Sequence, residues 1–297
     1  MRAAVVVSTY NRAAYLRELV TCLLAQTYRD FEIVIVDNGS TDETPKLGLA
    51  TMRLEHNRGP GGGRNAGVAS TDAEIIVFTD DDCLPTPTWL ERLLPTFDDP
   101  DVVVVQGRVD PDPVTRDQMG PFDHTISVHG ATPFFETANV AYRRAAFDAA
   151  GGFLERTGRA FGEDAALGAA VMAGGGTRAY VDVAVVHHRC VARTFKQHLA
   201  DERQLRLFPA LLTKSGFLNR TTALFDLAVL GTLVSPFSLL ALTAALPWLG
   251  RRLRMTRGYA GDDVSRIPRI LAKYAVSDAV AFASLVEGTV KARRVLL

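Results

Sequence analysis

Four short runs of apolar residues stand out in the first 107 residues of the chain. They occupy residues 3–8, 31–36, 74–79 and 102–107, and segments with a helical spacing of apolar residues separate them. The four runs are nearly continuous in apolar residues and do not alternate with polar ones. This pattern is typical of strands that are buried on both faces, so it predicts a mostly parallel sheet.

The segments between these runs predict helices. They cover residues 13–26, 62–70 and 86–97, and the first of them repeats apolar residues with the spacing of one helix face, at Leu16, Leu19, Leu23 and Leu24. Strands that alternate with helices indicate right-handed βαβ units. The fold class is therefore α/β, with an open and mostly parallel sheet.

The pattern becomes less regular after residue 107. Residues 108–135 are rich in proline and glycine and predict a long irregular excursion, of the kind that often serves as a functional lid or loop. Beyond it we expect helices near 143–150 and 163–173, a strand over 179–188 and a polar helix over 194–207.

The C-terminal part has a different composition. Residues 227–249 contain no charged residue and are long enough to span a bilayer, but Pro236 lies near their middle. Basic residues flank both sides, which conflicts with a single crossing under the positive-inside rule. We expect a re-entrant hairpin or interfacial helices, and a buried helical hairpin is the alternative. A final helix over about 266–293 ends in "KARR", which suits anionic headgroups.

These patterns predict two regions. Residues 1–210 form the α/β domain, and residues 211–297 form an apolar helical appendage that associates with a membrane. The N-terminal sequence does not resemble a signal peptide, and three widely spaced cysteines do not form a disulfide framework. The expected location is therefore the cytoplasmic face of a membrane.

Overall composition excludes some classes of function. Hydrophobic residues make up 47% of the 297 residues, which is enough for a packed core and argues against general disorder. The formal net charge is +0, which gives no electrostatic basis for binding nucleic acid. We therefore expect no nucleic-acid partner.

Polar residues gather where three of the predicted strands end. The strand ends read "STYNR" (8–12), "VDNGSTD" (36–42) and "TDDD" (79–82). Ligands of open α/β sheets bind beyond the carboxyl ends of the strands, so these side chains are expected to converge. Three consecutive carboxylates repel one another unless positive charge compensates them. They are either a solvated acidic turn or the ligands of a metal ion.

Three common α/β enzyme classes do not fit these strand ends. Asp37 lies where a dinucleotide-binding fold has its ribose-binding acid, but the turn after the first strand contains no glycine. The chain has no G-K-[ST] of a P-loop, and it has no G-x-G-T-R-like loop of a nucleotidyltransferase.

The ordered set of motifs resembles the inverting nucleotide-sugar glycosyltransferases of family 2, which have the GT-A fold. The resemblance covers roughly residues 3 to 208. It is carried by "VVVSTYNR", "IVIVDNGSTDET", "NRGPGGGRNAG", "FTDDDC", "GGF" and "GED", in that order. Each motif alone is weak evidence, whereas the ordered set is specific.

The resemblance implies a nucleotide-sugar donor site built from the first strand ends and the glycine-rich segment. Asn38 stands where the family often has a second acid, which leaves the donor base open. Arg64 would approach the diphosphate or base, while Gly59 and Gly61 to Gly63 would allow close backbone approach or form a flexible turn. The residues expected to hold the nucleoside are Ser8, Thr9, Tyr10, Asn11, Asp37 and Asn38.

A divalent metal, Mn²⁺ or Mg²⁺, is also implied by the resemblance. Asp80 would lie toward the ribose and a metal-bound water, Asp82 would ligate the metal, and His188 rather than His187 would complete the site. Asp81 belongs to the same donor site, and we expect it to tolerate substitution best.

Catalysis is implied for the "GED" motif. Asp164 would be the general base and Glu163 its support, although either acid could instead simply cap the N-terminus of a helix. Glu136 and Asn139 resemble the segment that lines the acceptor side.

The expected reaction is the transfer of a single sugar, with inversion, to a lipid-linked or cell-envelope glycan. The Q-x-x-R-W motif of processive members is absent. The competing hypothesis is a catalytically silent nucleotide-sugar-binding scaffold at a membrane, although such a protein would typically have lost a metal or base carboxylate.

Overall fold

The structure is a computed structural model that describes residues 2–155, 162–207, 239–260 and 263–291. For residues 239–249 and 282 it describes the backbone only. The whole predicted apolar segment, residues 227–249, lies outside the residues whose side chains are described, so its relation to a membrane stays a prediction. None of the helices within the described ranges is long and apolar enough to cross a bilayer.

The chain forms two compact units. The first comprises residues 1–117 and 125–190, and the second comprises 118–124 and 191–297. The second unit thus begins earlier than the predicted boundary at residue 210. The reason is an aromatic cluster within that unit, in which the Phe122 ring lies 5.0 Å from Phe195 and 5.3 Å from Tyr274.

An eight-stranded sheet forms the centre of the first unit, in the order β3-β2-β1-β4-β7-β6-β8-β5. β1 pairs in parallel with β2 and β4, β2 with β3, and β6 with β8. β7 is antiparallel to both of its neighbours, and β5 is antiparallel to β8. The strands are Ala3–Thr9 (β1), Phe31–Asp37 (β2), Met52–Arg53 (β3), Ile75–Phe78 (β4), Cys83–Pro85 (β5), Val102–Pro111 (β6), Val140–Arg143 (β7) and Thr177–His188 (β8).

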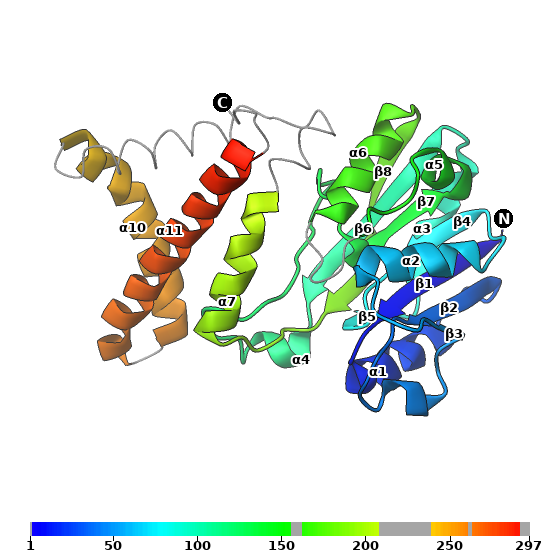
Figure 1. The fold of residues 1–297 in the computed structure, drawn as a ribbon, viewed down its shortest axis with the longest axis horizontal. Coiled ribbons are helices and arrows are strands. Elements are labelled where there is room, and N and C mark those ends of the chain that lie inside the picture. The colour runs from blue at the N-terminus through cyan, green and yellow to red at the C-terminus, as the bar shows by residue number, and fades with distance from the viewer. Residues whose placement is uncertain (1, 156–161, 208–238, 261–262, 292–297) are drawn as a thin grey trace. The chain divides into compact units, whose positions relative to one another are not determined.

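Helices cover both faces of this sheet (Figure 1). Val5 and Val7 of β1 join one buried cluster with α1 and α3, and Ala4 and Val6 join a second cluster with α2, α5 and α6. Alternate residues of the same strand therefore reach opposite layers, as expected for a strand that is buried on both faces. The helices are Ala13–Leu24 (α1), Gly59–Ala69 (α2), Trp89–Leu93 (α3), Pro113–Arg116 (α4), Arg144–Ala149 (α5) and Glu163–Ala173 (α6).

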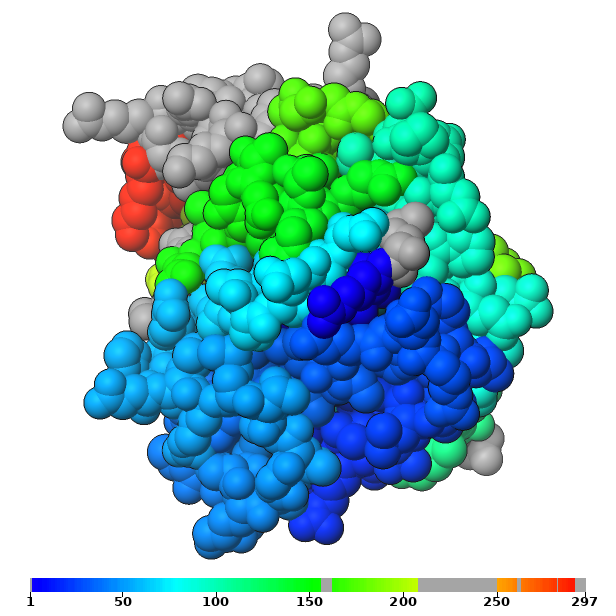
Figure 2. Space-filling view, turned by 90° about the vertical axis from the view of Figure 1, so that its right-hand side faces the viewer, coloured from blue at the N-terminus to red at the C-terminus, as the bar shows by residue number. Residues whose placement is uncertain are grey.

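The expected elements are largely confirmed in this unit, with local differences. Leu16, Leu19 and Leu23 are buried as predicted, whereas Leu24 is 63% exposed at the end of α1. The excursion expected from residue 108 begins later, because β6 continues to Pro111 through its pairing with β8. In Figure 2 the N-terminal residues of this unit, in shades of blue, form one continuous surface.

The glycine-rich segment forms the start of α2. Gly59 has a φ of +77° at the first position of this helix. A Cβ atom at Gly63 would lie 2.1 Å from Ser8 Oγ, and one at Gly67 would lie 2.6 Å from Val6. These glycines therefore allow α2 to pack closely on β1, and the segment is not a flexible turn.

The second unit is helical where the structure describes it. α7 (Phe195–Glu202) begins with a capping box formed by Thr194 and Gln197. α10 (Leu239–Ala260) and α11 (Ile267–Lys291) follow, and α11 agrees with the predicted final helix to within two residues. Short 3₁₀ helices complete the described chain at Thr44–Leu47, Leu94–Asp98, Thr137–Asn139, Arg203–Leu207 and Val264–Arg266.

Candidate active site

The three polar strand ends converge at one edge of the sheet, as the sequence predicts. The Thr9 hydroxyl, at the end of β1, donates a hydrogen bond of 2.7 Å to an Asp81 carboxylate oxygen. The backbone N–H of Asn11 donates to Ser40 Oγ at 2.9 Å, which ties the first strand end to the second. Asn11 has a φ of +56°, a left-handed conformation that asparagine adopts more readily than most residues.

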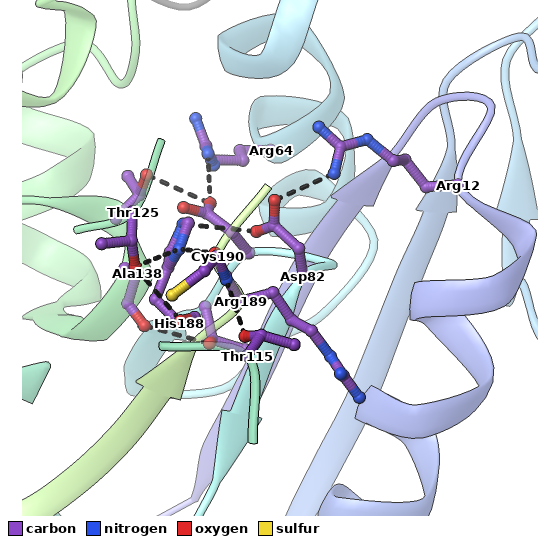
Figure 3. A network of polar contacts seen from close by, with 12 residues as sticks. Arg12, Arg64, Asp82, Thr115, Thr125, Ala138, His188, Arg189 and Cys190 are labelled. Atoms are coloured by element: carbon purple, nitrogen blue, oxygen red, sulfur yellow. Dashed lines mark hydrogen bonds and ion pairs between the residues drawn. The ribbon is translucent and has the colours of Figure 1, made fainter. Parts of the chain in front are cut away.

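Each carboxylate of the Asp80–Asp82 triplet has its own partner. Arg64 Nη2 lies 2.6 Å from Asp80 Oδ1, and Arg12 Nη1 lies 2.9 Å from Asp82 Oδ2. Figure 3 shows the two arginines approaching from different elements, Arg64 from α2 and Arg12 from the turn that follows β1. The triplet is therefore a largely buried, compensated cluster and not a solvated turn.

Asp81 is the member of the triplet without a direct ion pair in the part of the chain that the structure describes. Burial raises the pKa of Asp81 to about 7 and Asp82 adds to the rise, while Arg12 and the hydroxyl of Thr9 act in the opposite direction. The sequence suggested that Asp81 would tolerate substitution best. The structure argues against this, because Asp81 is 8% exposed and bonded to the first strand end.

His188 is oriented toward Asp82 by its own backbone neighbour. Its Nδ1 lies 2.8 Å from the carbonyl oxygen of Arg189, so Nδ1 carries the proton and donates. Its Nε2 lies 3.5 Å from Asp82 Oδ1. An imidazole whose Nδ1–H is fixed by a carbonyl presents Nε2 as a ligand, which is a common arrangement at metal sites.

Four residues could hold a metal ion together. One ligand atom from each of Asp80, Asp82, Cys83 and His188 lies within 4.8 Å of the others. The carboxylate oxygens and the imidazole suit Mn²⁺, and the carboxylates also suit Mg²⁺. Burial and the carboxylates of Asp80 and Asp82 raise the pKa of the Cys83 thiol well above its usual value. The donor set fits the divalent cation that the resemblance implies.

Arg64 connects this triplet to a second pair of acids. The guanidinium is buried, and its Nη1 lies 3.5 Å from a Glu163 carboxylate oxygen. Burial lowers the pKa of Arg64, but Asp80 and Glu163 outweigh that effect, so the pKa is raised overall. Within the described residues, its Nε and Nη1 atoms have no hydrogen-bond acceptor. Such buried donors are suited to an incoming anionic group.

Asp164 lies in the first turn of α6, beside Glu163. Burial raises the pKa of Asp164 to about 8, and Glu163 and Glu136 contribute to the rise, whereas Arg64 and the N–H of Ala165 lower it. A carboxyl group with a pKa near the working pH suits a general base. The predicted N-terminal position of "GED" is confirmed, while the catalytic role stays a prediction.

Asp37 and Asn38 are buried and bonded within the protein. Asp37 accepts from the N–H of Ser40 at 2.9 Å and from Arg53 at 2.6 Å. Asn38 is 1% exposed, donates to the Gly59 carbonyl oxygen at 2.8 Å and accepts from the N–H of Arg58 at 3.0 Å. The geometry therefore gives Asn38 the role of holding the start of α2, which argues against its predicted contact with the base.

The remaining predicted residues divide between site and scaffold. Tyr10 is 41% exposed beyond the end of β1, whereas Ser8 packs against Gly63. Glu136 accepts from Thr132 at 2.5 Å and from Gln106 at 3.2 Å. Asn139 is buried, accepts from Trp89 and donates to two backbone carbonyl oxygens, which argues against its predicted place on the acceptor side.

Sequence reasoning missed three residues of this site. Arg12 pairs with Asp82, Cys83 belongs to the possible metal ligands, and Thr137 donates to Asp80 at 3.2 Å. Arg12 and Cys83 both lie inside the quoted motifs "STYNR" and "FTDDDC", so the available signal was their position directly after a strand end. Thr137 has no comparable local signal.

The geometry agrees with comparisons to known protein families. A model of glycosyl transferase family 2 matches residues 4–157. An uncharacterized glycosyltransferase of Nostoc sp. is 33% identical over 165 residues, which cover 48% of this chain and 51% of that protein. A glucosyl-dolichyl phosphate glucuronosyltransferase of Haloferax volcanii is 30% identical over 185 residues, which cover 54% of this chain and 58% of that protein. The chain spans about half the length of these curated relatives.

Solved structures share the fold. A mannosyltransferase from Pyrobaculum calidifontis in complex with GDP-Man and Mn²⁺ aligns with a TM-score of 0.61 at 22% identity, over 98% of this chain and 86% of that chain. Residues 1–349 of S. aureus TarS in complex with UDP-GlcNAc align with a TM-score of 0.56 at 17% identity, over 99% of this chain and 93% of that chain. At these identities the likeness shows the GT-A fold.

Proposed function

The chain belongs to glycosyl transferase family 2, whose model matches just over half of its residues, 4–157, and from that premise we propose that it transfers one sugar from a nucleotide-diphosphate sugar to an acceptor hydroxyl. The observation that carries the proposal is the cluster of Asp80, Asp82 and His188, joined through Arg64 to the acids at the start of α6. A sugar-diphosphate reaction needs both a site for the leaving diphosphate and a base for the acceptor.

The donor would bind at the edge where the polar strand ends meet. A divalent cation held by Asp80, Asp82 and His188 would stabilise the charge that develops on the leaving nucleoside diphosphate. Arg64, with buried donors that lack an acceptor within the described residues, would contact a diphosphate oxygen. Tyr10, which is half-exposed, offers a ring on which the base can stack.

The acceptor would react on the side of α6. Its hydroxyl oxygen forms a bond to the anomeric carbon, the bond from that carbon to the diphosphate oxygen breaks, and the proton passes to the Asp164 carboxylate. Attack opposite the leaving group inverts the anomeric configuration. Glu163, fixed by its ion pair with Arg64, would hold this end of the site in place.

The substrates are inferred at the level of their chemical class. Structural relatives hold GDP-Man or UDP-GlcNAc, which supports a nucleotide-sugar donor and leaves its base and sugar open. A relative named as a glucosyl-dolichyl phosphate glucuronosyltransferase supports a lipid-linked or cell-envelope glycan acceptor. The uncharged stretch of residues 227–249 supports work at the cytoplasmic face of a membrane.

The proposal is tested with the purified full-length chain and a panel of nucleotide sugars. Donor binding is followed by thermal shift with and without Mn²⁺, and turnover is then measured with membrane extract as the source of acceptor. We expect a metal-dependent shift with one donor class and release of the matching nucleoside diphosphate. Absence of turnover with every donor, in both Mn²⁺ and Mg²⁺, contradicts the proposal.

A catalytically silent nucleotide-sugar binder is the competing function. It would show the same metal-dependent thermal shift but no release of nucleoside diphosphate with any acceptor extract. The presence of carboxylates at both the metal and base positions favours the enzyme.

A further inference from the structure

Cys83 faces the metal side of the site. It is the first residue of β5 and is the direct antiparallel partner of His188 on β8. Directly opposed residues of an antiparallel pair place their side chains on the same face of the sheet. The Cys83 sulfur accordingly lies within 4.8 Å of ligand atoms of His188, Asp80 and Asp82.

The position of this thiol is specific to Cys83. Cys22 and Cys190 are also free thiols, but neither belongs to a group of possible metal ligands within the described residues. Cys83 is completely buried and also packs in a hydrophobic cluster. An alanine or valine could serve packing alone, whereas a sulfur atom beside two carboxylates and an imidazole changes which metal ions the cluster can bind.

We propose that Cys83 is a sulfur ligand of this metal centre and biases it toward thiophilic divalent cations such as Zn²⁺ and Co²⁺. The inference rests on the proposed function only in assigning a metal to the same carboxylates. When the metal–sulfur bond forms, the thiol proton passes to solvent. Sulfur ligands favour Zn²⁺ over Mg²⁺, and an N/O/S site binds Zn²⁺ more tightly than Mn²⁺.

The geometry of the four residues suits a tetrahedral ion. Zn²⁺ with one sulfur, one nitrogen and two oxygen ligands places the ligand atoms roughly 3.3–3.8 Å apart. The ligand atoms lie within 4.8 Å of one another, and small rotations of the side chains would bring them to these shorter distances. Zinc sites with four protein ligands are closed, whereas catalytic sites keep an open position. Zn²⁺ held by all four residues would therefore exclude the donor diphosphate, and we expect Zn²⁺ to inhibit the Mn²⁺-loaded protein.

The test is a Co²⁺ titration of the purified full-length chain, followed by absorption spectroscopy. A thiolate ligand gives Co²⁺ an intense near-ultraviolet charge-transfer band. We expect this band in the wild type, its loss in C83S and C83A, and its retention in the matched control C22S/C190S. Outer-shell residues already change metal affinity by about 10–100-fold, so removal of a direct ligand should weaken Zn²⁺ binding at least tenfold. Mn²⁺ binding should change less.

Co²⁺ that binds without the band, or a band that survives in C83S, overturns the inference. X-ray absorption at the zinc edge of the wild type gives a readout that requires no variant to fold, and a shell without sulfur also overturns it. These outcomes are separable from failure of the proposed function. A sulfur-ligated metal without sugar transfer refutes the enzyme proposal alone, and sugar transfer with an all-oxygen and nitrogen shell refutes the Cys83 proposal alone.

Discussion

The two groups of acids in this site are compensated differently. Arg64 contacts one member of each group, Asp80 in the triplet and Glu163 at the start of α6. In each group the member without a direct ion pair in the described structure has a raised pKa, about 7 for Asp81 and about 8 for Asp164. Burial is the largest cause of the raised pKa at both carboxyl groups. The triplet is paired with arginines at Asp80 and Asp82, whereas the acids at the start of α6 include Asp164, the carboxyl group that we propose as the base.

The largest effect is expected from removing the charge at the metal side. Asp82→Asn should lower kcat by about 10⁴-fold, because several kcal/mol of stabilisation of the leaving group are lost. Mn²⁺ affinity, measured by calorimetry, should fall in the same variant. Asp98→Asn, at an acid that ends the 3₁₀ helix Leu94–Asp98, is the control. A variant D82N that binds Mn²⁺ normally would contradict the assignment of Asp82 as a ligand.

A smaller effect is expected on the base side. Asp164→Asn should lower kcat by about 10³-fold, within the range of general-base catalysis, and should leave Mn²⁺ affinity and donor binding unchanged. The rate of the wild type should rise with pH and level off above about 8, because the pKa of Asp164 is about 8 and only the carboxylate accepts the proton. The pKa of Asp164 also depends on nearby charges: Glu163 and Glu136 raise it, and Arg64 lowers it. Equal rates at pH 6 and pH 8 would exclude Asp164 as the base.

Substitution of Arg64 removes the ion pairs that connect Asp80 of the triplet with Glu163 at the start of α6. Arg64→Met should reduce the free energy of unfolding by about 3–5 kcal/mol, because a buried pair that loses one partner leaves an uncompensated charge. Arg12→Met is the matched variant, since Arg12 pairs with one carboxylate and its side chain is 33% exposed. Arg12→Met should reduce the free energy of unfolding by about 1 kcal/mol or less. Urea unfolding monitored by circular dichroism measures both, and equal losses would contradict the central position of Arg64.

The last prediction concerns how the free energy of unfolding depends on pH. The pKa of Asp164 is raised from 3.8 to about 8 on folding, so its contribution to stability is fully present below pH 3.8 and is lost as the pH rises through about 8. Asp164→Asn cannot ionise and should therefore gain stability relative to the wild type across that window, by at most about 1.4 kcal/mol per pH unit. Urea unfolding at several pH values measures the difference. If the difference between the two proteins does not change with pH, the pKa of Asp164 is not raised by folding.

The sequence predicted the part of the fold in which each element has a strong local signal. The strands with runs of aliphatic residues, such as Val5 to Val7, and the amphipathic α1 were found, and so was the convergence of their polar ends. β7 was missed because its four residues, Val140–Arg143, follow a short 3₁₀ helix and carry no long apolar run. Its antiparallel insertion between β4 and β6 depends on tertiary pairing, which a local pattern does not encode.

The site was predicted unevenly for a similar reason. Motif order identified Asp80, Asp82, Asp164 and His188, whose neighbourhood the structure now describes. The order of the motifs did not show that the side chains of Asn38 and Asn139 form hydrogen bonds with other residues of the protein. Whether a polar side chain faces a ligand or a backbone atom depends on its partners across the fold. Those partners lie 21 and 50 positions away in the sequence.

The pairing of β5 with β8 has a consequence for protein engineering. Two histidines, His187 and His188, stand side by side at the end of β8, and adjacent residues of a strand point to opposite faces. Register alone therefore decides which imidazole is presented to Asp82. A one-residue insertion in β8 before His187 would place His187 opposite Cys83 and turn His188 to the other face, because a slip of one residue inverts the faces. Metal affinity, measured in a series of variants with insertions or deletions in β8, would therefore report the register between β5 and β8.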